Sequence, residues 1–149
     1  MSPMRRFHFR ARPSGVFDYV NELLEALPPP YRTDDVRMGL HEALGNAIIH
    51  GALGVGSRDV MGLDTFLLAV AEAETEPERR VVYVAIEQRG AGMVRIVIDD
   101  CGPGFDHERA LVRPGRGLAF VESGFTHAEY QRGGRRLVLD LGGATCSAA

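Results

Sequence analysis

The spacing of apolar residues changes between the two halves of the chain. In the first half, apolar residues recur at i, i+3 and i+4, which is the spacing of one buried face of a helix. In the second half they alternate with polar residues or form short β-branched runs, which is typical of strands. The pattern predicts helices over about residues 14–27, 33–50 and 63–73, and strands over about 5–11, 80–87, 93–99, 125–131 and 135–141.

Capping and turn residues mark the ends of these segments. Ser14, and either Thr33 or Asp34, can cap the first two helices by accepting a hydrogen bond from a free backbone N–H. The run Pro28–Pro30 ends the first helix, and residues 88–92 predict a hairpin turn. A short helix is expected over 117–123, and residues 142–149 should fray. Because helices come mainly before strands, we expect a single α+β domain over residues 1–149, built as a layered sandwich.

Composition narrows the choice of partners and of compartment. The net charge of −3 gives no indication of a nucleic-acid partner, and no apolar run is long enough to span a membrane. The N-terminus lacks the apolar core of a signal peptide, and two cysteines do not form a disulfide framework. We therefore expect a cytoplasmic protein. All 17 basic residues are arginine, which excludes a phosphate-binding loop that ends in Gly-Lys.

Three polar residues lie four positions apart on the second predicted helix. Glu42, Asn46 and His50 would form a stripe beside its apolar side, because a spacing of four places side chains on one face. Asn46 is unusual in the middle of a helix, and its small and apolar neighbours suggest partial burial. A buried amide needs hydrogen-bond partners. The simpler alternative is a surface glutamate and a satisfied core asparagine.

Two glycine-containing motifs follow the strand over 93–99. The sequence Asp100-Cys-Gly102-Pro-Gly104 places a carboxylate at a strand end, where a ligand can approach the flexible backbone. Its alternative is a plain turn with an acidic rim. Further on, Gly115 and Gly117 precede the predicted helix over 117–123, whose free N–H groups could receive an anion. A flexible loop before an ordinary helix would give the same pattern.

Together these motifs resemble one known superfamily. HEALGNAIIHG resembles the N-box of the GHKL (Bergerat-fold) ATPases and kinases, DDCGPGFD their first glycine box, and GRGL their second. The similarity is greatest to the anti-sigma factor serine/threonine kinases. It covers residues 33–141, with 51–79 as an insertion. The resemblance implies a two-layer α/β sandwich, with helices on one face of a mixed, largely antiparallel sheet.

The resemblance also implies a role for each matched residue. Asp100 would accept a hydrogen bond from the adenine amino group, and Asn46 would hold Mg²⁺ beside the phosphates of ATP. Glu42 would be the catalytic base. Residues 106–114 would form a lid, with Arg109 and Arg113 near the phosphates. The remaining nucleotide-binding residues would be Gly102, Gly104, Gly115, Arg116, Gly117 and Leu118.

These roles imply a regulatory kinase that uses ATP and Mg²⁺ to phosphorylate a serine or threonine of a small antagonist protein. Its partners would be a sigma factor, that antagonist, or both, and analogy with relatives favours a homodimer. Two alternatives stay open: a non-catalytic ATP-binding interaction module, and a detached ATP-binding domain of a sensor histidine kinase. The first is favoured by Arg135, which stands where many relatives carry a threonine near the adenine.

Overall fold

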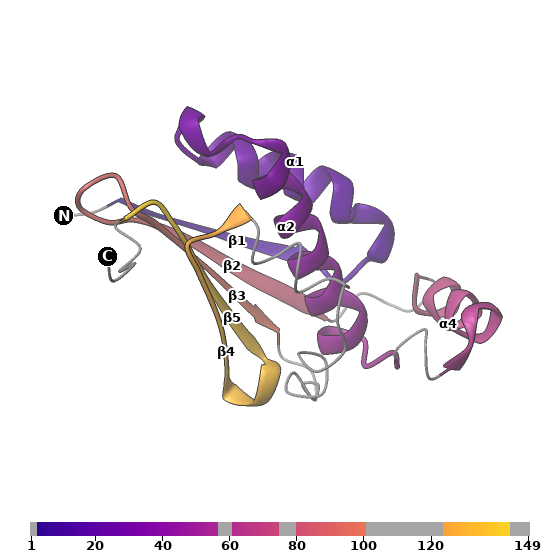
Figure 1. Cartoon of the computed structure of the whole chain (residues 1–149). Coiled ribbons are helices and arrows are strands. Elements are labelled where there is room, and N and C mark those ends of the chain that lie inside the picture. The colour runs from indigo at the N-terminus through magenta and orange to yellow at the C-terminus, as the bar shows by residue number, and fades with distance from the viewer. Residues whose placement is uncertain (1–2, 57–60, 75–79, 101–123, 144–149) are drawn as a thin grey trace.

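The protein is an α+β sandwich in which one face of a sheet is covered by helices. The computed structural model describes residues 3–56, 61–74, 80–100 and 124–143 (Figure 1). Its five strands follow the order β1-β2-β3-β5-β4, and all four strand pairings are antiparallel. The helices α1 and α2 lie together on one side of the sheet. This architecture confirms the predicted fold class.

The strands lie within two residues of their predicted positions. Alternating burial along β2 and β3 shows why, since every second residue packs into the core. The hairpin between them turns through Ala91 and Gly92, whose φ angles of 63° and 74° match the two left-handed positions of the turn that suits twisted strands. The strands are β1 (Met4–Arg10), β2 (Val81–Gln88), β3 (Val94–Asp100), β4 (His127–Gln131) and β5 (Arg136–Leu141).

The helices also agree with the sequence, with one correction at a cap. Thr33 caps α2, because its Oγ1 accepts a hydrogen bond from Val36 N at 3.2 Å. The prediction that Ser14 caps α1 is wrong. Ser14 lies in a short 3-10 turn, and both its N and its Oγ donate to the carboxylate of Glu74. The helices are α1 (Val16–Ala26), α2 (Asp34–Asn46) and α4 (Leu63–Glu74), with shorter turns η1 (Pro13–Gly15), η2 (Pro29–Tyr31) and η4 (Arg132–Gly134).

The hydrophobic core fills the space between the helices and the inner face of the sheet. Leucines of α1 and α2 meet alternate residues of β2, β3 and β5, and each fully buried side chain contributes about 1.5–3 kcal/mol relative to exposure. Burial of this kind fixes α2 firmly over the sheet. The largest fully buried side chains are Leu23, Leu27, Leu40, Leu44, Ile48, Ile96, Ile98, Leu139, Leu141, Val20, Val82 and Val84.

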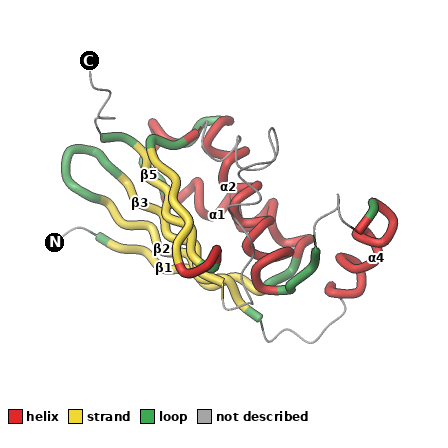
Figure 2. Tube along the Cα trace, turned by 60° about the horizontal axis from the view of Figure 1, so that its bottom comes forward, coloured by secondary structure: helices red, strands yellow, loops and turns green. Residues whose placement is uncertain are grey.

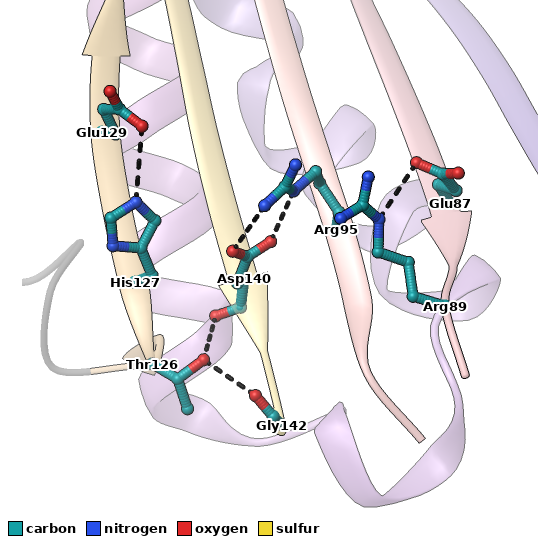
Figure 3. A network of polar contacts seen from close by, with 8 residues as sticks. All are labelled: Glu87, Arg89, Arg95, Thr126, His127, Glu129, Asp140 and Gly142. Atoms are coloured by element: carbon teal, nitrogen blue, oxygen red, sulfur yellow. Dashed lines mark hydrogen bonds and ion pairs between the residues drawn. The ribbon is translucent and has the colours of Figure 1, made fainter. Parts of the chain in front are cut away.

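The outer face of the sheet carries cross-strand ion pairs. Arg95 of β3 donates two hydrogen bonds to Asp140 of β5, at 2.8 and 3.1 Å (Figure 3). Arg136 of β5 binds Asp99 of β3 in the same two-pronged way, at 2.7 and 3.1 Å. Such paired guanidinium–carboxylate contacts fix the register of neighbouring strands, because both partners must lie directly opposite each other.

The helix α4 stands apart from the rest of the molecule (Figure 2). None of its residues is buried, and Leu63, Leu67 and Leu68 are more than half exposed. It is attached through Glu74, which binds Ser14, and through Phe66, whose ring lies 6.3 Å from the ring of His50. Over the described ranges, no helix is both long and apolar enough to cross a bilayer.

Candidate functional site

The helix that carries the N-box residues does not stop at Asn46. It continues as a π-helix, η3 (Ala47–Ala52), in which Leu53 N donates to Ile48 O, five residues back, at 2.9 Å. The expected helix through about His50 is therefore confirmed, with two further residues. A π-turn is wider than an α-turn, and such segments occur frequently at functional sites. In this protein, one residue of the π-helix faces the sheet.

That residue is Gly51, and it faces the carboxylate of Asp100. Asp100 is the last residue of β3, and its side chain lies on the inner face with only 6% of the residue exposed. A β-carbon added to Gly51 would lie 2.5 Å from Asp100 Cγ and 2.9 Å from Oδ1. Atoms at such distances collide, so only glycine lets the helix end approach the carboxylate this closely. Sequence reasoning gave Gly51 no role beyond ending the helix.

Asp100 is also fixed through its backbone. Its N–H donates to Arg135 O on the neighbouring chain segment, at 2.9 Å. Arg135, the residue that departs from the family pattern, therefore lies directly beside Asp100, with its side chain exposed. The carboxylate predicted to receive adenine thus lies against η3, and its backbone is bonded to the residue just before β5.

Asn46 lies against Tyr130 of β4. Tyr130 pairs with Leu137 on the inner face, packs against the core, and has a buried hydroxyl. Burial raises the pKa of this phenol to about 12, and a hydrogen bond with the Asn46 side chain offsets part of that rise. Asn46 is partly buried, as predicted. Sequence reasoning missed Tyr130, although a tyrosine at an inward-facing strand position is expected to need a polar partner.

The strand register places Asn46 and Asp100 at the same end of the sheet. Tyr130 lies opposite Leu137, and Leu137 lies opposite Ile98, which is two residues before Asp100. Asp100 therefore lies near the same level of the sheet as Tyr130, two residues further along β3 and two strands away. Glu42 is half-buried one turn before Asn46 on the same helix.

Other residues contact the end of the helix without belonging to the predicted site. His50 Nδ1 lies 2.7 Å from Val55 O, a contact that joins the helix end to the segment that follows it. Arg80 donates to Ala52 O at 2.9 Å and so satisfies a carbonyl at the end of η3. The remaining predicted ligand-binding residues, like the expected lid and the helix over 117–123, lie outside the described residues: Gly102, Gly104, Gly115, Arg116, Gly117 and Leu118.

The described residues fit ATP and Mg²⁺ by their chemistry. A carboxylate such as Asp100 accepts hydrogen bonds from an exocyclic amine. The amide oxygen of Asn46 is a hard ligand of the kind that Mg²⁺ takes, and Mg²⁺ also binds phosphates. The space beside Gly51, which a β-carbon would fill, is occupied by the carboxylate of Asp100. Mg²⁺ held here would neutralise charge on the phosphates.

A comparison with protein families identifies the domain. The family model for the histidine kinase-like ATPase domain matches residues 11–142, which is most of the chain. This match confirms the predicted superfamily and indicates ATP as the ligand. A search of curated proteins finds no match. Because this model covers most of the chain and the fold agrees with it, the chain belongs to the histidine kinase-like ATPase domain family.

Proposed function

We propose that this domain is a regulatory protein kinase that transfers the γ-phosphoryl group of ATP to a serine or threonine of a small antagonist protein. The kind of activity follows the anti-sigma factor kinases, which the three motifs resemble. The observation that supports the proposal is the buried carboxylate of Asp100 at the end of β3, which lies against Gly51, close to the end of the helix that carries Glu42 and Asn46.

Each of the three residues has a distinct task in the proposed reaction. Asp100 receives the adenine amino group, and Asn46 offers its amide oxygen to the cation. Glu42 takes the proton from the attacking hydroxyl while a bond forms between that oxygen and the γ-phosphorus. The bond from the γ-phosphorus to the bridging oxygen breaks, and ADP leaves with the electron pair. Positioning and charge neutralisation account for most of the acceleration in phosphoryl transfer.

Calorimetry of ATP binding, with and without Mg²⁺, tests the nucleotide site. Wild type should bind ATP, and Mg²⁺ should strengthen the binding. Asp100→Asn presents an amide nitrogen or oxygen where a carboxylate is required, so binding should weaken at least about tenfold, the equivalent of one lost hydrogen bond to a charged group. Unchanged affinity in Asp100→Asn would remove Asp100 from the adenine site.

Phosphoryl transfer needs a second variant. Glu42→Ala should bind Mg-ATP as wild type does and should lose transfer of labelled phosphate to the antagonist protein, because the base contributes typically about 10²–10⁴-fold. Candidate acceptors are the small proteins encoded beside a sigma factor. Transfer at the wild-type rate by Glu42→Ala would show that Glu42 is not the base.

A non-catalytic interaction module is the second candidate. Two observations favour it: Arg135 lies directly beside Asp100 in place of the usual threonine, and Leu63, Leu67 and Leu68 are exposed on a protruding helix. In this case ATP would stabilise one conformation that a protein partner recognises. ATP-dependent binding of a sigma factor or antagonist without any phosphate transfer would favour the module over the kinase.

A further inference from the structure

The first strand of the chain, β1, forms one edge of the sheet (Figure 2). On its paired side, Ala11 N donates to Arg80 O at 2.9 Å. Because the backbone direction alternates along an antiparallel strand, the odd-numbered residues of β1 bond to β2 and the even-numbered residues point away from it. The N–H and C=O groups of Arg6 and His8 are therefore directed at the side of β1 where the described residues provide no further strand.

The side chains of this edge strand carry charge of one sign. Its sequence, MRRFHFR, contains three arginines and a histidine but no carboxylate. Phe7 and Phe9 face the helices, so the residues between and beside them face outward and are exposed. The residue opposite Arg6 on β2 is Ala85, which offers the guanidinium no charge.

Other outward arginines of the sheet have a carboxylate directly opposite on the neighbouring strand. Arg95 lies opposite Asp140, and it donates two hydrogen bonds to that carboxylate (Figure 3). Arg136 lies opposite Asp99 and binds it in the same way. Arg6 also points outward, but its one neighbouring strand provides an alanine. A carboxylate directly opposite Arg6 would therefore have to come from a strand on the other side of β1.

We propose that the edge of β1 binds an extended acidic segment of a partner protein, which adds a sixth strand to the sheet. The segment pairs with the backbone of Arg6 and His8 and places carboxylates opposite their side chains on the outer face. The residue between those carboxylates is apolar and meets Phe7, whose ring is partly exposed on the inner face. This inference does not depend on the proposed kinase activity.

Two other occupants fit this edge less well. Two copies of the chain paired through β1 would set cations against cations, which destabilises cross-strand pairs. A nucleic acid has no backbone N–H and C=O groups to pair with a strand, and the net charge of −3 opposes it. Charged edge strands also serve simply to repel other strands. That explanation predicts that no acidic segment binds.

A short synthetic peptide in which glutamate alternates with valine is the probe. Calorimetry without nucleotide should show that it binds wild type. Arg6→Glu should weaken this binding about tenfold, because an attractive cross-strand pair becomes repulsive. A peptide with lysine in place of glutamate should bind Arg6→Glu better than wild type. Arg132→Glu is the matched control, since it makes the same charge change at an exposed position beside the opposite edge strand, β4, and it should bind the glutamate peptide as wild type does.

Pairing through the backbone has a separate readout. The N–H groups of the glutamates point to one edge of the bound peptide and those of the valines to the other, so N-methylation of one set should abolish binding and N-methylation of the other should leave it unchanged. Two methylated peptides of equal affinity would show attraction between charges without an added strand, and would overturn the proposal.

Amide hydrogen exchange locates the peptide on the protein. The N–H groups of Arg6 and His8 should exchange rapidly in the free protein and slowly in the complex. Slow exchange without peptide would mean that the edge is already covered, by this chain or by a second copy, and would overturn the proposal. Absence of binding by wild type would do the same and would leave the arginines as a device that repels other strands.

Discussion

Asp99 and Asp100 are chemically identical neighbours, but they lie on opposite faces of the sheet. Asp99 faces outward, and Arg136 binds it through two hydrogen bonds. Asp100 faces inward, lies against Gly51 and is almost fully buried. The difference follows from the two-residue alternation of a strand, which assigns one carboxylate to strand pairing and the other to the predicted adenine site.

The same contrast extends over the whole sheet. The outer face carries Arg95 and Asp140, whose ion pair joins β3 to β5, and further charged residues near the strand ends (Figure 3). The inner face carries apolar side chains, together with Asp100 and Tyr130 where the sheet meets the end of the helix. The charged residues named on the outer face form ion pairs that stabilise the sheet. The polar residues of the inner face lie against the helix that carries the N-box residues. Four substitutions can test this division.

The largest effect is expected at Gly51. In Gly51→Ala the new methyl group collides with the carboxylate of Asp100, and either the carboxylate or the helix end must move. Displacement of Asp100, the predicted adenine-binding residue, should weaken ATP binding at least about tenfold, since a lost charged hydrogen bond is worth about 1.5–3 kcal/mol. Calorimetry measures this directly. Wild-type affinity in a folded Gly51→Ala protein would show that the close approach is unnecessary.

The next effect is expected at Arg95, on the outer face. The hydrogen bonds from Arg95 lower the pKa of the Asp140 carboxyl in the folded protein. Above about pH 4, the pKa of an aspartate in the unfolded chain, the ion pair stabilises the fold in full. This contribution is lost as the pH falls through the lower pKa of the folded state. Arg95→Met should cost about 1–3 kcal/mol at pH 7, because Asp140 is left partly buried without its partner. Between pH 4 and the folded pKa, the variant should lose less stability than wild type. Urea unfolding at pH 7 and at about pH 3 measures both.

A smaller effect is expected at Asp99. Its ion pair with Arg136 is partly exposed, and pairs of this kind contribute at most about 1 kcal/mol. Asp99→Asn should therefore cost up to about 1 kcal/mol in unfolding free energy and leave ATP affinity within about twofold of wild type. The comparison with Asp100→Asn is the direct test of the two faces. A large loss of ATP affinity in Asp99→Asn would contradict the division.

The smallest effect is expected at Gly45, and its sign is opposite. Gly45 lies inside α2, and a β-carbon there would meet no atom within 4 Å. Gly45→Ala should stabilise the protein by about 0.5–1 kcal/mol, because alanine loses less backbone freedom than glycine when a helix forms. Thermal unfolding should show a rise of a few degrees. Destabilisation would indicate that the space beside Gly45 is needed.

The elements of this fold could be predicted from the sequence because their signals are local. Periodicity located α1, α2, α4 and the five strands, and Thr33 was recognisable as a cap from its residue type. Ser14 has the same chemistry and does not cap its helix. Its hydroxyl binds Glu74, sixty residues away in the chain, and no local pattern can show such a competitor.

The candidate site also contains residues that local sequence signals predict and residues that they do not. Glu42, Asn46 and Asp100 were predicted as site residues from motifs whose residues are close in sequence, and their roles stay predictions. Gly51 and Tyr130 were missed, because each acts through one contact between distant segments: Gly51 with Asp100, and Tyr130 with Asn46. A sequence shows that a buried amide needs a partner, but only the strand register shows which tyrosine provides it.

The hydrogen bond between Asp100 and Arg135 bears on the order of synthesis. Asn46 and Asp100, the predicted ligand-binding residues, are both translated before the hairpin of β4 and β5, which contains Arg135. Domains fold as units while the chain emerges from the ribosome at about 5–20 residues per second. A nascent chain that ends before this hairpin therefore contains Asp100 without that hydrogen bond. If Asp100 binds the adenine, we expect ATP to stabilise the newborn protein only after that hairpin has left the exit tunnel.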